Sequence, residues 1–96
     1  MIKDKNELQT ALIDSVMACD LDCVRRLLQQ GANPSVGLDA AQVTPLHFAA
    51  QNSDVNIVKE LLRYGANSMA KTVPDGETPL DIACLYNHLA IIELLK

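Results

Sequence analysis

Aromatic side chains are scarce in this sequence of 96 residues, which has one phenylalanine, two tyrosines and no tryptophan. Hydrophobic residues nevertheless make up 49% of the chain. The core must therefore consist of Leu, Ile, Val and Ala, whose small aliphatic side chains suit closely packed helices. A chain of this length has room for one domain with a modest core.

Runs of basic residues and long apolar runs are also absent. The formal net charge of −4 comes from interspersed acids and bases, whereas phosphate neutralisation requires clustered Lys and Arg, so nucleic acid is not an expected partner. No apolar run approaches the length of a signal-peptide core or a membrane span. We therefore expect no membrane partner and a cytoplasmic location, with the nucleus as the alternative.

Cysteines are few and unpaired in number: Cys19, Cys23 and Cys84. An odd count without CxxC spacing argues against a disulfide framework and for a reducing compartment. Cys19 and Cys23 could supply two thiolates to a metal, but no second ligand pair follows at the spacing of a zinc finger. We therefore expect neither a metal nor another cofactor.

The chain repeats itself at a fixed interval, because Gly31-Ala32-Asn33 recurs as Gly65-Ala66-Asn67, a shift of 65 − 31 = 34. Thr44-Pro45-Leu46 recurs at the same interval as Thr78-Pro79-Leu80. Hydrophobic positions keep this register, as in the triplets Val24, Val58, Ile92 and Leu27, Leu61, Leu95. We expect one domain over residues 1–96 with repeats at approximately 6–33, 34–67 and 68–96.

Each unit is predicted to form two short helices joined by a tight turn and followed by a long turn. In the second unit the Thr44 hydroxyl can cap a helix, and Pro45 suits the first helical position. The polar residues 52–54 interrupt that helix, and Gly65 ends the next one because glycine readily adopts the left-handed conformation. Helices below about 12–15 residues are marginal alone, so the units should stack on one another.

The repeated segments resemble a known family. Residues 44–50, TPLHFAA, closely resemble the TPLHxAA signature of ankyrin repeats, residues 57–67 resemble its IVKxLLxxGAD continuation, and residues 75–83 resemble the opening of a further repeat. The first unit lacks TPLH and resembles an amino-terminal capping repeat, in which polar residues such as Asp14 replace outward core positions. The resemblance implies an all-α ankyrin-repeat solenoid, with three stacked helix-turn-helix repeats joined by fingers formed as β-turns or hairpins.

Three departures from the family pattern affect the turns. Ankyrin repeats usually run about 33 residues, so the extra residue should lengthen or bulge each finger. The glycine that normally ends the first helix of a pair is replaced by Cys19, Ser53 and Asn87. Only asparagine tolerates the left-handed region comfortably, so the first two turns should be differently shaped or strained. The first finger has Ala41-Gln42 where the second has Asp75-Gly76.

The remaining reactive and charged residues are best explained as structural. By register, Cys84 and Cys23 replace Ala50 and Ile57 and are expected in the core, whereas Cys19 should be exposed in a turn. The resemblance implies that the His47 imidazole bonds back toward Thr44 and the adjacent turn, with Asp81 in this place in the third unit and His88 also structural. Interspersed charges are expected on solvated outer faces, namely Arg25, Arg26, Lys59, Glu60 and Glu93. No catalytic set is predicted.

Recognition of another protein or peptide, through the concave face and fingers, is the function that the resemblance implies. Leu38, Val43, Leu85 and Tyr86 should be apolar yet exposed, unless Leu85 or Val43 packs under a finger. Tyrosine is enriched in binding hot spots, so Tyr86 is the strongest single candidate. Register places Met17 on the same surface and gives this set of partner-binding residues: Leu38, Ala40, Ala41, Val43, Gln51, Asn52, Thr72, Pro74, Asp75, Glu77, Leu85 and Tyr86.

Two alternatives remain open. The chain could be the interaction segment of a larger enzyme or signalling protein whose activity lies elsewhere, or a metal- or redox-responsive protein using Cys19 and Cys23. Residues 91–96 form an apolar helix without a polar outer face, although terminal repeats normally need one. We therefore expect further repeats beyond this end, or another chain, including a second copy, that covers it.

Overall fold

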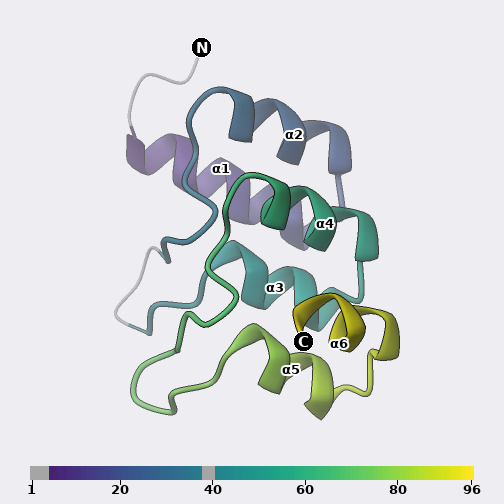
Figure 1. Ribbon diagram of the computed structural model, residues 1–96. Helices are drawn as coiled ribbons and strands as arrows, with labels where there is room; N and C mark the ends of the chain where they lie inside the picture. Colours follow the sequence, from purple (N-terminus) through teal and green to yellow (C-terminus); the bar gives the residue numbers. More distant parts are fainter. Residues whose placement is uncertain (1–4, 38–40) are drawn as a thin grey trace.

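The computed structural model describes residues 5–37 and 41–96, and this part of the chain contains helices and no strands (Figure 1). Consecutive helices form three helix-turn-helix pairs, which confirms the predicted all-α fold of three stacked repeats. In chain order the helices are α1 (Lys5–Met17), α2 (Leu21–Gln29), α3 (Pro45–Asn52), α4 (Val55–Arg63), α5 (Pro79–Leu85) and α6 (Leu89–Leu95).

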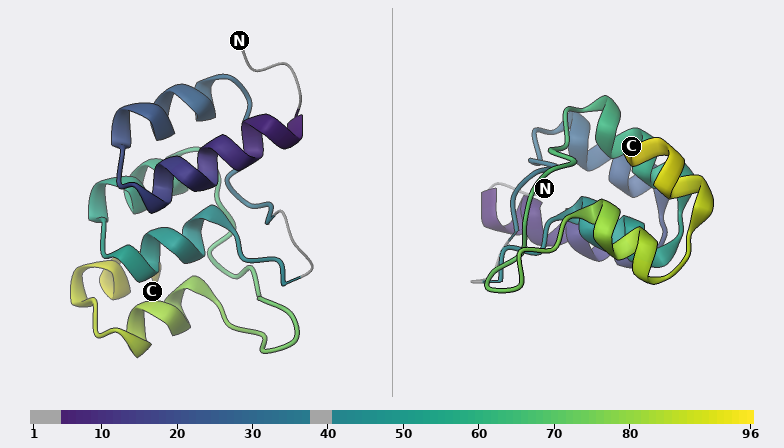
Figure 2. Two further views of the ribbon diagram at one scale, coloured as in Figure 1. Left: turned by 180° about the vertical axis from the view of Figure 1, so that it is seen from behind. Right: turned by 60° about the horizontal axis from the view of Figure 1, so that its bottom comes forward.

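The six helices stack in two layers. The inner layer consists of α1, α3 and α5, and the outer layer of α2, α4 and α6, with each helix contacting the next one in its own layer. The two long connections project from the same side of the stack (Figure 2). We call residues 34–43 the first finger and residues 68–77 the second finger. The described part of the fingers contains turns, so hairpins of paired strands are not formed there.

Threonine caps begin α3 and α5 as predicted. The Thr44 N–H donates to His47 Nδ1 (3.1 Å), and the Thr78 N–H donates to Asp81 Oδ2 (3.0 Å), while each threonine hydroxyl accepts a backbone N–H in return. Each helix thus starts in a reciprocal capping box. His47 also donates from Nε2 to the Glu77 carbonyl (2.8 Å) in the second finger. The predicted roles of His47 and Asp81 are confirmed.

The turns inside the three helix pairs share one conformation. Cys19, Ser53 and Asn87 have φ values of 57°, 61° and 57°. After α1, the Cys19 N–H donates to the Val16 carbonyl (3.1 Å), the following N–H reaches Ser15, and matching bonds follow α5. This is the Schellman arrangement normally closed by glycine. The first two turns therefore have the same positive φ as the third, so the prediction of a different shape is wrong. The other predicted outcome, strain, applies to Cys19 and Ser53, because both are non-glycine residues in the left-handed region.

Glycine at these turns should stabilise the protein. The left-handed conformation costs a non-glycine residue on the order of 1 kcal/mol, and less for asparagine. We expect Ser53→Gly and Cys19→Gly each to raise the free energy of unfolding by about 0.5–1 kcal/mol, and Asn87→Gly to raise it less. Urea unfolding of the three variants checks this order. Equal gains, or losses at Ser53 and Cys19, would contradict the assigned strain.

The core runs through the stack as a set of aliphatic side chains in repeat register. Each fully buried aliphatic side chain contributes about 1.5–3 kcal/mol, which is how stacking stabilises helix pairs too short to stand alone. The fully buried members are Leu12, Val16, Val24, Leu46, Ala49, Ala50, Ile57, Val58, Leu61, Ala83 and Ile91.

Among the described residues, one charged side chain lies inside the stack, contrary to the prediction of a solvated outer face. Glu60 on α4 is buried, with Oε2 3.2 Å from Arg25 Nε on α2 and Oε1 3.4 Å from Arg63 Nη1. The two guanidinium groups remain largely accessible to solvent. Glu60 is thus buried between the first and second repeats because it has a partner in the preceding repeat.

Candidate functional site

The carboxyl-terminal ends of the three inner helices carry exposed side chains in register. Met17, Gln51 and Leu85 occupy one position in successive repeats, and Met17 and Leu85 are 55% and 71% exposed. Asn52 and Tyr86 occupy the following position in the second and third repeats, and Tyr86 is 49% exposed. Burial of Leu85 under a finger is excluded by its exposure. Three large apolar side chains therefore face solvent along one edge of the inner layer.

Hydrogen bonds across the repeats hold this edge in place. The Asn52 amide donates to the carbonyls of Val16 (3.3 Å) and Met17 (3.4 Å). His88 donates from Nε2 to the Gln51 carbonyl (3.0 Å), which confirms its predicted structural role. The Tyr86 ring stacks on the His88 ring, with centroids 5.9 Å apart and planes inclined by 14°. Tyr86 is therefore both exposed and held in one orientation.

The fingers are tied to each other and closed internally. The Val73 N–H donates to the Ala41 carbonyl (2.8 Å), which joins the second finger to the first. Within the second finger the Thr72 N–H donates to the Glu77 carbonyl (2.9 Å), and the Gly76 N–H donates to the Thr72 carbonyl (2.8 Å). The two projections thus form one bonded surface.

The predicted finger residues differ in their accessibility. Pro74 and Asp75 are exposed at the tip of the second finger, and Ala41, Val43 and Glu77 are half-buried. Thr72, which was predicted on the accessible surface, is buried, and its hydroxyl accepts the Glu77 N–H (3.1 Å). Its polar side chain serves the turn itself. Leu38 and Ala40 lie outside the described residues.

The structure separates the predicted site into two groups. The finger residues precede the amino-terminal ends of α3 and α5, whereas Gln51, Asn52, Leu85 and Tyr86 lie at the carboxyl-terminal ends of these helices. With a rise of about 1.5 Å per residue, helices of this length separate the two groups by roughly 10–12 Å. A partner that contacts both groups must extend along the inner helices.

The three free cysteines occupy different environments. Cys19 is exposed as predicted, whereas Cys23 is half-buried and does not belong to the core in which the register placed it. A hydrogen bond with Asp20, together with burial, raises the pKa of the Cys23 thiol, which disfavours the reactive thiolate. The prediction of a core position for Cys84 is wrong, because this side chain is exposed on a face that no described residue covers. No cluster of three or more metal-ligating side chains occurs among the described residues.

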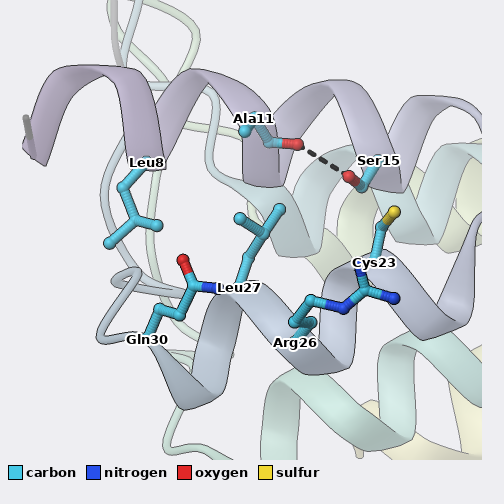
Figure 3. Close-up of a pocket in the computed structure, with 7 residues that line it drawn as sticks. All are labelled: Leu8, Ala11, Ser15, Cys23, Arg26, Leu27 and Gln30. Carbon is cyan, nitrogen blue, oxygen red and sulfur yellow. Dashed lines mark hydrogen bonds between the residues drawn. The ribbon is translucent and has the colours of Figure 1, made fainter. Parts of the chain in front are cut away.

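A groove of about 710 Å³ lies between α1 and α2, on the face of the first repeat that points away from the second (Figure 3). Its apolar floor includes Leu8, Ala11 and Leu27. The outward face of this repeat is therefore only partly polar, unlike a full cap, although Asp14 is exposed as expected. Sequence reasoning missed the groove. The repeat register could have revealed it, since Leu27 corresponds to the core residue Leu61.

Within the described residues, no helix is long and apolar enough to cross a membrane. The family model for ankyrin repeats (three copies) matches residues 12–96.

Among curated proteins, the ARF GTPase-activating protein Git of Drosophila melanogaster is 37% identical over 91 residues, covering 95% of this chain and 12% of Git. The human 2-5A-dependent ribonuclease is 36% identical over 80 residues, covering 83% and 11% of the two chains. Bovine ankyrin repeat and SOCS box protein 5 is 41% identical over 81 residues, covering 84% and 24%. The chain thus spans a quarter or less of each of these relatives.

Proposed function

Because this chain belongs to the ankyrin-repeat family, we propose that it is a non-catalytic module that binds a protein or an extended peptide through its concave face and fingers. The observation that carries the proposal is the edge of exposed Met17, Leu85 and Tyr86. Neighbouring exposed apolar side chains, as at Leu85 and Tyr86, mark interaction sites more often than isolated ones do. Tyr86 is already oriented by His88, so little of its side-chain entropy is lost on binding.

The chemistry of the two histidines supports a non-catalytic role. A general base needs a free ring nitrogen within reach of a substrate. His47 is fully buried and engages both ring nitrogens, with Thr44 and with the Glu77 carbonyl. His88 donates from Nε2 to the Gln51 carbonyl, so this nitrogen is not available as a base. The three free cysteines suit the cytoplasm, a reducing compartment, and we place the module there.

Removal of the Tyr86 ring should weaken partner binding. We expect Tyr86→Ala to reduce affinity by about 1 kcal/mol or more, roughly fivefold to tenfold, without a change in helix content. A pull-down with the wild-type chain identifies the partner, and titration calorimetry then gives the dissociation constant of each variant. The matched control is Tyr64→Ala, which removes an exposed tyrosine from the outer layer. Equal affinity of wild type and Tyr86→Ala would remove Tyr86 from the site.

A second candidate function is the interaction segment of a larger enzyme or signalling protein. The lengths of the relatives favour it, since the matched region is 12% of Git and 11% of the ribonuclease. Sequencing the transcript on both sides of the 96 codons tests it. Flanking coding sequence for a catalytic domain would support this candidate, and stop codons at both boundaries would reject it.

A further inference from the structure

The two ends of the stack present faces that correspond to the buried surfaces between its repeats. The first-repeat end face is the groove lined by Leu8, Ala11, Ser15, Cys23, Arg26, Leu27 and Gln30. The third-repeat end face is defined by Leu80, Cys84 and Ile92. Each residue of these two faces has a counterpart at a junction inside the stack. That counterpart lies one or two repeat intervals away in the sequence.

The third-repeat end face repeats a surface that is covered elsewhere in the molecule. The residues that correspond to this face in the first two repeats are all fully buried. They are Leu12, Val16 and Val24 in the first repeat, and Leu46, Ala50 and Val58 in the second. In the third repeat Leu80 and Ile92 are half-buried, and Cys84 is exposed. The apolar character is thus retained on a face that no repeat among the described residues covers.

The first-repeat end face repeats the complementary surface. Ala11, Cys23 and Leu27 correspond to Pro45, Ile57 and Leu61 of the second repeat, which are fully buried. In the first repeat the first two of these positions are only half-buried and line the open groove (Figure 3). Each end of the stack therefore carries one half of the junction that holds the repeats together.

Charge selects what can complete this junction. Inside the stack, Arg25 of the first repeat pairs with Glu60 of the second. On the third-repeat end face, Glu93 stands at the register position of Arg25. On the first-repeat end face, Arg26 stands at the register position of Glu60. Both charges are reversed together, so one end is again complementary to the other. Glu93 also has Lys96 at 3.1 Å, just as Glu60 has Arg63 in addition to Arg25.

We infer that copies of this chain associate head to tail, with the third-repeat end face of one copy on the first-repeat end face of the next. Arg26 of one copy pairs with Glu93 of its neighbour, and the aliphatic side chains around them continue the core across the junction. Such a heterologous contact leaves one complementary end free on each side, so assemblies grow with concentration instead of stopping at a dimer.

The three native cysteines report this contact without any mutation. In a stack, Cys84 and Cys23 occupy the places of Ala50 and Ile57, which are fully buried, whereas Cys19 occupies the place of Ser53, which is exposed. The rate of alkylation by iodoacetamide can be followed at each cysteine by peptide mass spectrometry. As the protein concentration is raised from micromolar to millimolar, this rate should fall at Cys84 and Cys23 and stay constant at Cys19. Unchanged alkylation of Cys84 at concentrations where the chain associates would overturn the head-to-tail arrangement.

Charge exchange tests the pairing itself by sedimentation velocity. Arg26→Glu and Glu93→Arg each place like charges across the junction, so each should weaken association about tenfold or more. An equimolar mixture of the two variants should associate like the wild type, because every mixed junction again joins an acid to a base. Lys59→Glu, at the same register in the middle repeat, is the matched control and should leave association unchanged.

Three further results would overturn the inference. They are a wild-type chain that stays monomeric at millimolar concentration, a closed dimer that does not grow further, and a mixture of Arg26→Glu and Glu93→Arg that associates no better than either variant alone. Circular dichroism of each variant at low concentration should match the wild type, since Arg26 and Glu93 are exposed. If a variant loses helix content, the alkylation experiment still tests the inference, because it uses the native chain.

Discussion

Replacement of His47 by alanine should lower the free energy of unfolding by about 2–3 kcal/mol. The ring is fully buried, and it accepts the Thr44 N–H at Nδ1 and donates from Nε2 to the Glu77 carbonyl. Alanine would leave the Thr44 N–H and the Glu77 carbonyl without this partner, and an unsatisfied buried polar group costs about 1–3 kcal/mol. Urea unfolding monitored by circular dichroism measures the loss.

The matched control is Asp81→Ala, which removes the same register position in the third repeat. Asp81 is exposed, and its contact with Thr78 is local to its own capping box, so its loss should cost about 0.5–1 kcal/mol. The difference between the two variants reports the bond from His47 to the second finger together with the packing of the buried ring. Equal losses would show that this bond across the repeats contributes nothing to stability.

Elements defined by local chemistry could be predicted from the sequence. The threonine and proline at the start of α3 specify the capping box, and the repeat register places Leu61 in the core in both sequence and structure. Gly65 ends α4 with φ at 88°, as its conformational freedom predicts. The common feature is that each result depends on residues within one turn or one repeat.

The errors arise where a residue depends on its neighbours in space. Register assigns Cys84 to the core because Ala50 is buried, but burial also requires a following repeat, which the described residues do not supply. Thr72 has the composition of an exposed turn residue, yet its hydroxyl closes the finger. The shared φ of Cys19 and Ser53 could not be predicted either, because residue preference alone disfavours it.

The burial of Glu60 is the most informative of these differences. An acidic residue between apolar stripes predicts a side chain that faces solvent. Its partner in the structure is Arg25, which lies 35 positions earlier in the sequence and compensates the charge of buried Glu60. One repeat interval plus one residue separates the pair. Charges of opposite sign at that separation are therefore a sequence signal for contact between consecutive repeats. Arg26 and Glu93 are 93 − 26 = 67 positions apart within the chain, so they correspond to such a pair only where a second copy continues the repeat register.

Reversal of the charge at Arg25 should destabilise the fold by about 2 kcal/mol. Arg25→Glu places a second carboxylate against buried Glu60 and leaves only Arg63 to compensate it. Loss of a partner from a fully buried ion pair costs about 3–5 kcal/mol, and the partial exposure of Arg25 reduces that cost by solvent screening.

Urea unfolding measures the change in the free energy of unfolding, with Arg26→Glu as the control. Arg26 is the adjacent exposed charge without a contact to Glu60, so its reversal should change stability by less than about 0.5 kcal/mol.

Replacement of Glu60 by leucine separates the effect of repulsion from that of packing. The third repeat has Leu94 at this register, and aliphatic replacement of a buried ion pair is often neutral or stabilising. Glu60→Leu alone should therefore keep the free energy of unfolding within about 1 kcal/mol of the wild type. In the double variant Arg25→Glu/Glu60→Leu most of the stability lost in Arg25→Glu should be recovered, because the buried carboxylate that repels the introduced one is gone. A double variant as unstable as Arg25→Glu would mean that Arg25 acts through the packing of its aliphatic stem rather than through its charge.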